Sequence, residues 1–265
     1  MTSLLVQHAS MIVTMDDDRR RISDGALYIE DNFIQQVGPT DALPQTAGRI
    51  ISANGMVLLP GLINTHHHLY QTLTRAVPGA QDVELFRWLK TLYPIWAGLT
   101  GEAVYVSALV GLAELMMSGC TTAADHLYIF PNDVSLDDEI RAAEEIGIRF
   151  HATRGAMSRG ESQGGLPPDR VVEDEASILH DTRRVIETYH DPDPGAMIQI
   201  AVGPCSPFSV TESLMRESAV LARGYGVRLH THLAETADEE AYTEATSGKR
   251  PVEYADSLNW LGDDV

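Results

Sequence analysis

From residue 59 onward, the sequence alternates between short apolar runs and longer amphipathic segments, and this alternation allows few folds. The apolar runs predict strands at 59–68, 121–127, 148–155, 196–204 and 227–233. Apolar residues at helical spacing predict helices at 100–118, 136–146, 171–189, 212–225, 238–246 and 251–261. Strands that alternate with helices form a parallel sheet, because each helix carries the chain back to the start of the next strand. We therefore expect an α/β fold.

The candidate polar residues gather where the predicted strands end. They are His68, Asp125, His126, Arg154, Cys205 and Glu235. In a (β/α)8 TIM-type barrel, the carboxyl ends of the strands carry the active site. A doubly wound open sheet is the alternative, but no Gly-rich phosphate loop follows a predicted strand. A barrel needs eight strand–helix units and this chain supplies about five, so we expect the first five units of a longer enzyme.

Residues 1–58 are predicted to form β-structure of their own. Runs rich in Val, Ile, Leu and Tyr are separated by turn signals such as Asp16-Asp-Asp and Asn54-Gly55. Roughly three to five short strands fit this stretch, as one small sheet. We therefore place a domain boundary between residues 58 and 59.

The charge balance argues against a nucleic-acid partner. The 265 residues contain 38 acidic and 19 basic side chains, a net charge of −19, whereas binding a phosphate backbone requires clustered Lys and Arg. The N-terminal apolar run is interrupted by Gln7 and His8, so it is not typical of a signal peptide, and no run is long enough to span a membrane. With only Cys120 and Cys205, a disulfide scaffold is not expected. These features predict a cytoplasmic protein with no membrane partner.

Three consecutive histidines, His66, His67 and His68, follow the first apolar run of the barrel region. Side chains of a strand alternate between its two faces, so His66 and His68 are expected to face one way and His67 the other. Two imidazoles on one face, at the end of a strand, can bind one divalent ion. A chance His-rich turn is the alternative, but the preceding strand and Pro-Gly favour a metal site.

A second group of candidates lies at 230–235, in the sequence His-Thr-His-Leu-Ala-Glu. His232 suits a third metal ligand, and Glu235 suits the proton shuttle that a hydrolytic metal site commonly has nearby. His230 is interpreted as a core histidine. The alternative for Glu235 is a capping or solvated loop carboxylate. Together the two groups predict hydrolysis by a water molecule that a metal ion activates.

The scarcity of lysine favours one metal ion over two. Some bimetallic barrel hydrolases bridge their ions with a carbamylated lysine on the fourth strand, but the predicted fourth strand, 196–204, contains none. Only Lys90 and Lys249 are present, and both lie outside the predicted strands. Histidine nitrogens bind both zinc and iron. We expect a single divalent ion, zinc before iron.

Several other residues are candidates for the substrate pocket. Arg154 could bind an oxygen or carboxylate of the substrate, or it could form a structural ion pair. Cys205 is interpreted as a small buried residue that lines a pocket rather than as a nucleophile. Trp88 and Trp96 could cover a planar ring, although their helical spacing is more typical of packing.

Three motifs resemble those of the amidohydrolase superfamily, in its nucleobase and aminohydrolase branch. The motifs are Leu59-Pro-Gly-Leu-Ile-Asn-Thr-His-His-His-Leu-Tyr-Gln71, Ser118-Gly-Cys-Thr-Thr122 and His230-Thr-His-Leu-Ala-Glu235. The resemblance covers essentially the whole chain. It implies that residues 59–265 are strands 1–5 of a metal-dependent hydrolase barrel, and that residues 1–58 are the N-terminal part of a small β-sandwich.

The resemblance also implies the roles of individual residues. His66, His68 and His232 would be metal ligands, Glu235 would transfer protons, and Gln71 would contact the substrate ring, with Arg154 and Cys205 as further substrate-binding candidates. The implied reaction is hydrolytic deamination of a purine-like ring. Segments 125–132 and 203–209 most resemble those of enzymes that deaminate 8-oxoguanine, so the resemblance implies this substrate, which would give urate and ammonia. The partners would be a small nucleobase-like substrate and water. The sequence leaves the formation of a homo-oligomer undecided.

Two groups of alternatives stay open. Guanine, isoxanthopterin, adenosyl compounds and triazines are substrates of similar enzymes and are the alternative substrates. A weaker hypothesis is an α/β scaffold whose histidines are all structural. The family draws a further His from the sixth strand and an Asp from the eighth, and both would lie beyond Val265. The chain could therefore be an inactive metal-binding fragment, and alone we expect it to be inactive and prone to aggregate.

Overall fold

The computed structural model describes residues 2–265. They divide into two compact units, one of the residues up to Leu62 with Asp193–Gly195 and one of Ile63–Pro192 with Ala196–Val265. The division lies four residues after the boundary expected at residue 58. Among the described residues, every helix is too short or too polar to span a lipid bilayer.

The first unit is built on one mixed sheet of five strands. Its strands are β1 (Ser3–Val13), β2 (Arg21–Glu30), β3 (Phe33–Pro39), β4 (Arg49–Ser52) and β5 (Val57–Leu58). The order is β3-β2-β1-β4, and β5 also pairs with β1. β1 and β2 are antiparallel, while β4 and β5 run parallel to β1. Leu5, Ala9 and Ile12 are the buried residues of β1, and the pairing of β1 with β2 shifts its register between Val6 and Ala9.

The second unit contains a five-stranded sheet whose spatial order follows the sequence. Its strands are β6 (Leu62–Asn64), β7 (Cys120–Leu127), β8 (Arg149–Ala156), β9 (Ile198–Pro204) and β10 (Arg228–Leu229). The order is β10-β9-β8-β7-β6, and the pairs from β7 to β10 are parallel. A doubly wound sheet would reverse its strand order at a switch point. The observed order instead matches the curled sheet of a barrel.

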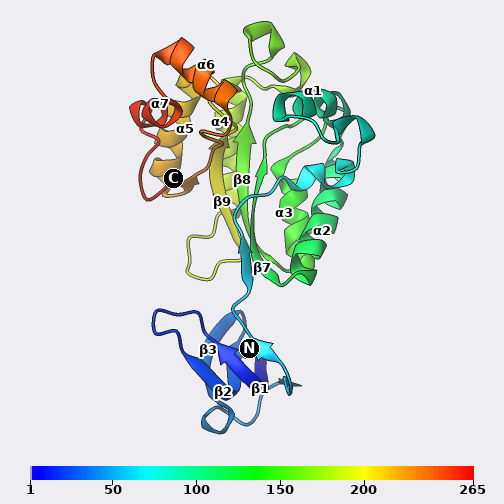
Figure 1. The fold of residues 1–265 in the computed structure, drawn as a ribbon, viewed down its shortest axis with the longest axis vertical. Helices are drawn as coiled ribbons and strands as arrows, with labels where there is room; N and C mark the ends of the chain where they lie inside the picture. The colour runs from blue at the N-terminus through cyan, green and yellow to red at the C-terminus, as the bar shows by residue number, and fades with distance from the viewer. Residues whose placement is uncertain (1) are drawn as a thin grey trace. The chain divides into compact units, whose positions relative to one another are not determined.

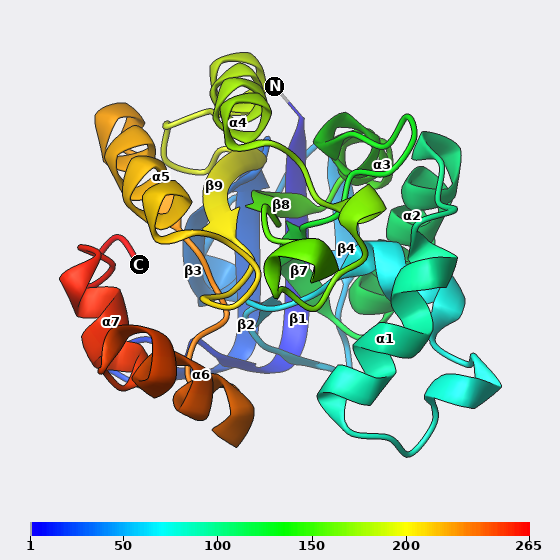
Figure 2. The same cartoon turned by 90° about the horizontal axis from the view of Figure 1, so that it is seen from above.

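Helices connect the strands and cover the outer face of the sheet. They are α1 (Leu85–Trp96), α2 (Gly101–Met117), α3 (Leu136–Ile146), α4 (Glu175–Tyr189), α5 (Glu212–Tyr225), α6 (Ala237–Ser247) and α7 (Pro251–Ser257). Helices α2 to α5 lie around the outside of β7, β8 and β9 (Figures 1 and 2). Buried Ile140, Val185 and Leu214, from three of these helices, belong to the main core.

Helices α2, α3, α5 and α6 agree with their predicted bounds to within one residue at each end. Helix α4 begins four residues later than predicted, α7 ends four residues earlier, and α1 was not predicted. Two strands are shorter than expected. The expected strands at 59–68 and 227–233 are reduced to Leu62–Asn64 and Arg228–Leu229. Beyond these strands the chain still follows its neighbour, because the N–H of His126 donates to the carbonyl of His67 at 2.9 Å. The histidines therefore lie just after the strand ends, in the loops that a barrel uses for catalysis.

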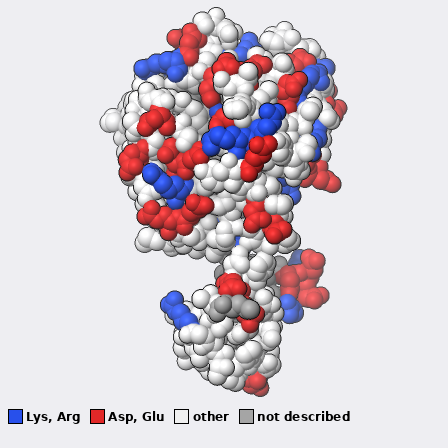
Figure 3. Space-filling view, turned by 180° about the vertical axis from the view of Figure 1, so that it is seen from behind, with Lys and Arg blue, Asp and Glu red and all other residues white. Residues whose placement is uncertain are grey.

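Charged side chains are spread over the surface. Figure 3 shows acidic groups across the visible face with basic groups between them. An excess of acidic groups, with a net charge of −19, favours a well-solvated surface.

Candidate metal centre and cavity

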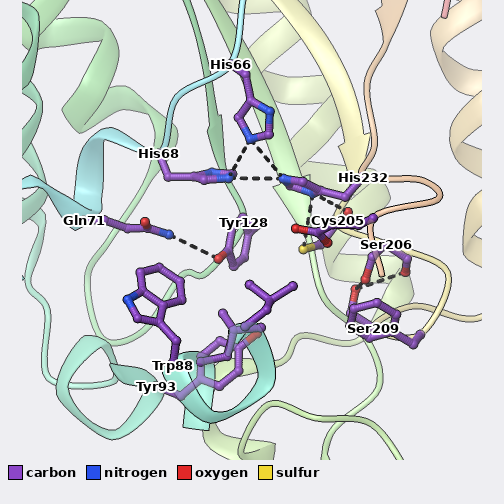
Figure 4. A pocket seen from close by; sticks show the side chains of 14 residues that line it. His66, His68, Gln71, Trp88, Tyr93, Tyr128, Cys205, Ser206, Ser209 and His232 are labelled. Carbon is purple, nitrogen blue, oxygen red and sulfur yellow. Dashed lines mark hydrogen bonds between the residues drawn. The ribbon is translucent and has the colours of Figure 1, made fainter. Parts of the chain in front are cut away.

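Three imidazoles meet at the carboxyl end of the sheet. The Nε2 atoms of His66 and His68 are 3.1 Å apart, those of His68 and His232 are 3.1 Å apart, and those of His232 and His66 are 3.3 Å apart. The rings point toward one centre although the first and last are 166 residues apart in the sequence (Figure 4). The predicted ligand candidates are thus brought together.

Backbone carbonyls orient two of these rings. Nδ1 of His68 lies 2.8 Å from the carbonyl oxygen of His126, and Nδ1 of His232 lies 2.7 Å from that of Cys205. A carbonyl only accepts hydrogen bonds, so each Nδ1 carries the proton and donates. The Nε2 lone pairs are therefore free and directed at the common centre. These two carbonyls could not be predicted from the sequence, because every residue has a backbone carbonyl.

The electrostatics of the site keep the rings neutral. Burial, together with the neighbouring His232, lowers the pKa of His68 to about 3. Burial also lowers the pKa of His66 and of His232. Protonated imidazoles cannot bind a metal ion, so these shifts favour the form that can.

The dimensions of the group fit a divalent ion. Four tetrahedral ligands at about 2.0–2.1 Å from a zinc ion are separated by roughly 3.3–3.4 Å. The three Nε2 separations of 3.1–3.3 Å are close to that value. These three side chains form a group that could hold a metal ion. Three nitrogens in this geometry leave a fourth position for water or substrate.

A cavity of about 180 Å³ opens at this group. Its remaining walls are formed by polar and apolar side chains from α1 and from the loops after the strands, namely Gln71, Leu85, Trp88, Leu89, Tyr93, Tyr128, Cys205, Ser206, Phe208, Ser209 and Glu235. Aromatic and aliphatic walls with a few polar groups are typical of a pocket for a flat heterocycle.

Glu235 lines this cavity beside the imidazoles. Burial raises the pKa of its carboxyl group, and the neighbouring His66 partly opposes this rise. A carboxyl whose pKa moves toward neutrality is better suited to exchange protons near pH 7. Glu235, the predicted proton shuttle, therefore lies beside the imidazoles, and its pKa is shifted in the direction that this role requires.

Gln71 is held by two buried phenols. Its Nε2 donates to the hydroxyl of Tyr70 at 3.0 Å and to that of Tyr128 at 3.3 Å. Within residues 2–265, its Oε1 makes no hydrogen bond, and the side chain lines the cavity. The arrangement leaves an acceptor available to a ligand (Figure 4).

Cys205 lines the cavity, but Arg154 does not. Burial raises the pKa of the Cys205 thiol to about 12, so it is a neutral S–H group near pH 7. Arg154 is 2 % exposed, and its guanidinium donates to Glu173 at 2.8 Å and to Asp181 at 2.8 Å. The ring of Phe130 stacks on it. Arg154 was predicted either to bind the substrate or to form a structural ion pair, and its contacts are those of an ion pair.

The remaining candidates fall outside or at the edge of the centre. His67 points away from the three rings, with Nδ1 4.0 Å from Asp125, and His230 lies beside His126 with ring centroids 4.9 Å apart. Trp88 lines the cavity, whereas Trp96 is fully buried in the core. Sequence reasoning missed Tyr128, Phe208 and Leu85, although the Leu85–Trp88–Leu89 spacing indicates one face of a helix.

Comparison with known families matches residues 57–264 to the model of the Amidohydrolase family. The chain belongs to this family. The match extends over the barrel region with its histidine group, as the resemblance predicted. The fold is therefore of the TIM-barrel type, with the candidate site at the expected end of the sheet.

Among curated relatives in the family, the 8-oxoguanine deaminase of Pseudomonas aeruginosa is 50% identical over 241 residues, which are 90% of this chain and 54% of the relative. The hydroxydechloroatrazine ethylaminohydrolase of Pseudomonas sp. is 33% identical over 280 residues, 100% of this chain and 57% of the relative. The chain thus spans little more than half the length of these relatives.

Solved structures of the family have the same fold. A triazine hydrolase variant superimposes with a TM-score of 0.95 at 33% identity, covering 100% of this chain and 60% of that one. An atrazine chlorohydrolase from Arthrobacter aurescens TC1, complexed with zinc, gives a TM-score of 0.93 at 34% identity, covering 99% and 59%.

Proposed function

We propose that this chain is the N-terminal part of a metal-dependent deaminase whose preferred substrate is 8-oxoguanine. In this proposal residues 59–265 form the first five units of the barrel, and residues 1–58 belong to a small β-sandwich. The observation that carries the proposal is the convergence of three neutral imidazoles beside a carboxyl group in one cavity. Two free, buried cysteines agree with a cytoplasmic enzyme.

His66, His68 and His232 would hold the divalent ion, and zinc is the preferred candidate. The zinc complex of the atrazine chlorohydrolase supports this choice. A divalent ion in such a site would lower the pKa of its bound water toward about 7, which would supply a nucleophile at neutral pH. The carbonyls of His126 and Cys205 would keep the lone pairs of His68 and His232 aimed at it.

Glu235 would move the protons of the reaction. Its carboxylate can take a proton from the attacking water and deliver it to a ring nitrogen of the substrate. It can then pass the proton of the newly added hydroxyl group to the amino group, so that ammonia leaves as the product carbonyl forms. The raised pKa of Glu235 supports this role, because both protonation states are then closer in energy near neutral pH.

The cavity walls would hold the ring in place. Oε1 of Gln71 would accept a hydrogen bond from a ring N–H, because its amide nitrogen is already engaged by two tyrosines. The neutral thiol of Cys205 would contact the ring without attacking it. Trp88 and Phe208 would supply flat apolar surface for the ring faces. No role in substrate binding is proposed for Arg154.

The choice of 8-oxoguanine rests on the relative that is 50% identical, compared with 33% for the isoxanthopterin deaminase. Guanine, isoxanthopterin, adenosyl compounds and triazines are the alternatives within the same chemistry. The alternative from a different functional class is a module that binds a metal ion but catalyses no reaction.

The test measures ammonia release and bound metal together. The longer enzyme to which this chain would belong is expected to release ammonia fastest from 8-oxoguanine, in a panel with guanine, isoxanthopterin and a triazine. Removing the metal with a chelator should abolish turnover, and His232→Ala should reduce metal affinity at least tenfold. Metal binding without turnover of any substrate would support the inactive module instead. Equal metal affinity of the wild type and His232→Ala would refute the proposed centre.

A further inference from the structure

Glu239 is a buried carboxylate in the first turn of α6 whose oxygens are used outside the helix. Its Oε1 accepts the backbone N–H of Ala234 at 3.0 Å, and its Oε2 accepts that of Glu235 at 2.7 Å. The side chain is 0 % exposed. The carboxylate thus binds two consecutive amides of the loop that follows His232.

Helix capping does not account for this geometry. Thr236 already caps α6, because its side chain accepts the N–H of Glu239 at 3.2 Å. A glutamate three residues after the cap normally turns back to the N–H of the capping residue itself. Glu239 instead reaches past Thr236 to the two preceding amides. Its contacts therefore serve the loop before the helix.

The loop needs such support. Ala234 has a φ of +57°, in the left-handed region that residues other than glycine rarely adopt. A backbone in this region persists only where its surroundings enforce it. The bend turns the chain directly after His232, so that the side chains of His232 and Glu235 both line the cavity.

We propose that Glu239 is a positioning residue that fixes Glu235 beside the metal-binding imidazoles. This inference rests on the proposed deaminase function. His232 is held separately, because its Nδ1 donates to the carbonyl of Cys205. Loss of the Glu239 contacts should therefore displace the proton-transferring carboxyl and leave the metal centre in place.

The first test replaces Glu239 by glutamine, which keeps the shape but removes one of the two acceptor oxygens. We expect Glu239→Gln to lower kcat for ammonia release about 10- to 100-fold, since small displacements of catalytic groups have effects of this size. KM and zinc affinity should change by less than about threefold. Glu244→Gln, at an exposed position of the same helix, should behave as the wild type.

A double-mutant cycle separates positioning from general stability. If Glu239 acts through Glu235, then Glu239→Gln should have no further effect on kcat in a Glu235→Gln background. An equal loss of kcat in both backgrounds would overturn the proposal. Ala234→Gly should restore part of the activity of Glu239→Gln, because glycine adopts the positive φ without strain.

Hydrogen exchange tests the contact without turnover. Glutamine keeps one acceptor oxygen, so at least one of the amides of Ala234 and Glu235 should exchange at least about tenfold faster in Glu239→Gln than in the wild type. Equal exchange rates would overturn the proposal, and Glu239→Asp serves if Glu239→Gln does not fold. If exchange changes as expected while the wild type releases no ammonia from any substrate, the proposed deaminase function is refuted. The contact of Glu239 with the amides of Ala234 and Glu235 is then still supported.

Discussion

At the scale of single residues, the direction of the Nδ1 proton separates the histidines by role. In His68 and His232 the Nδ1–H group donates a hydrogen bond to a backbone carbonyl, and the free Nε2 lone pair points to the centre shared with His66. His126 uses its ring differently, since its Nε2 lies 2.8 Å from the carbonyl of Gly203. The same residue type is thus a candidate ligand or part of the supporting core, according to its acceptor.

Cys205 should be a poor nucleophile in the folded protein. Burial raises the pKa of its thiol to about 12, so the thiolate that reacts with labels is scarce near pH 8. We expect labelling by a chromogenic disulfide to be at least about 100-fold slower in the native than in the unfolded protein. Cys205→Ser should bind zinc as the wild type does. Rapid native labelling, assigned to Cys205 by peptide mapping, would contradict this expectation.

At the scale of secondary-structure elements, glycines set how closely neighbouring strands approach. A Cβ atom on Gly155 of β8 would lie 2.2 Å from the carbonyl oxygen of Leu127, at the end of β7. The backbone of Leu127 cannot move away from such a Cβ atom as a flexible side chain could. The close packing of β7 and β8 below the candidate site therefore depends on glycine at this position.

Gly155→Ala should accordingly destabilise the protein by about 3 kcal/mol or more, measured as the free energy of unfolding in urea. Gly224→Ala is the matched control, because Gly224 lies in α5 and no atom is within 4 Å of the added Cβ. It should be neutral or stabilise by up to about 1 kcal/mol. Similar effects of the two substitutions would show that β7 and β8 are less tightly packed than the distances indicate.

An ion pair joins the start of α3 to α4. Hydrogen bonds from Arg184 and Tyr189 outweigh the effect of burial and lower the pKa of Asp137 to about 2. A carboxyl with a depressed pKa in the folded state stabilises the fold above its unfolded pKa, near 4. That contribution is lost as the pH falls through about 2.

Asp137→Asn should lower the unfolding free energy by about 1–2 kcal/mol at pH 7, a range reduced because the pair is partly exposed. The difference from the wild type should shrink between pH 4 and pH 2, as followed by thermal melts across that range. Glu144→Gln, at an exposed position of α3, should show no such dependence. A difference that stays constant down to pH 2 would rule out the ion pair as its source.

At the scale of the whole molecule, the parallel sheet has two edges, β6 and β10. A closed barrel has none, and open edges favour association between chains. Several apolar residues near the β6 edge are well exposed, including Leu59, Leu62 and Ile63, at 60–68%. Exposed edges and apolar residues together favour self-association.

We therefore expect the 265-residue chain alone to bind the dye ANS and to form larger species as its concentration rises, measured by size-exclusion chromatography with light scattering. Replacing Leu62 and Ile63 by Thr and Gln should reduce both effects, whereas a substitution at buried Leu229 should not. A monodisperse protein without dye binding at high concentration would contradict this expectation.

The sequence by itself determined the order of elements and the residues of the candidate centre. Helical periodicity and capping residues are local, so the bounds of α3 and α5 could be predicted to the residue. The His66-x-His68 spacing and the later His232 also carry their chemistry in the local sequence.

Only the tertiary structure decided what those residues contact. The imidazole separations, the carbonyl acceptors, the ion pairs of Arg154 and the reach of Glu239 depend on segments far apart in the chain or on a bend that no local pattern encodes. The physical reason is that side-chain periodicity records which face is buried, whereas hydrogen-bond partners depend on the packing of several elements at once.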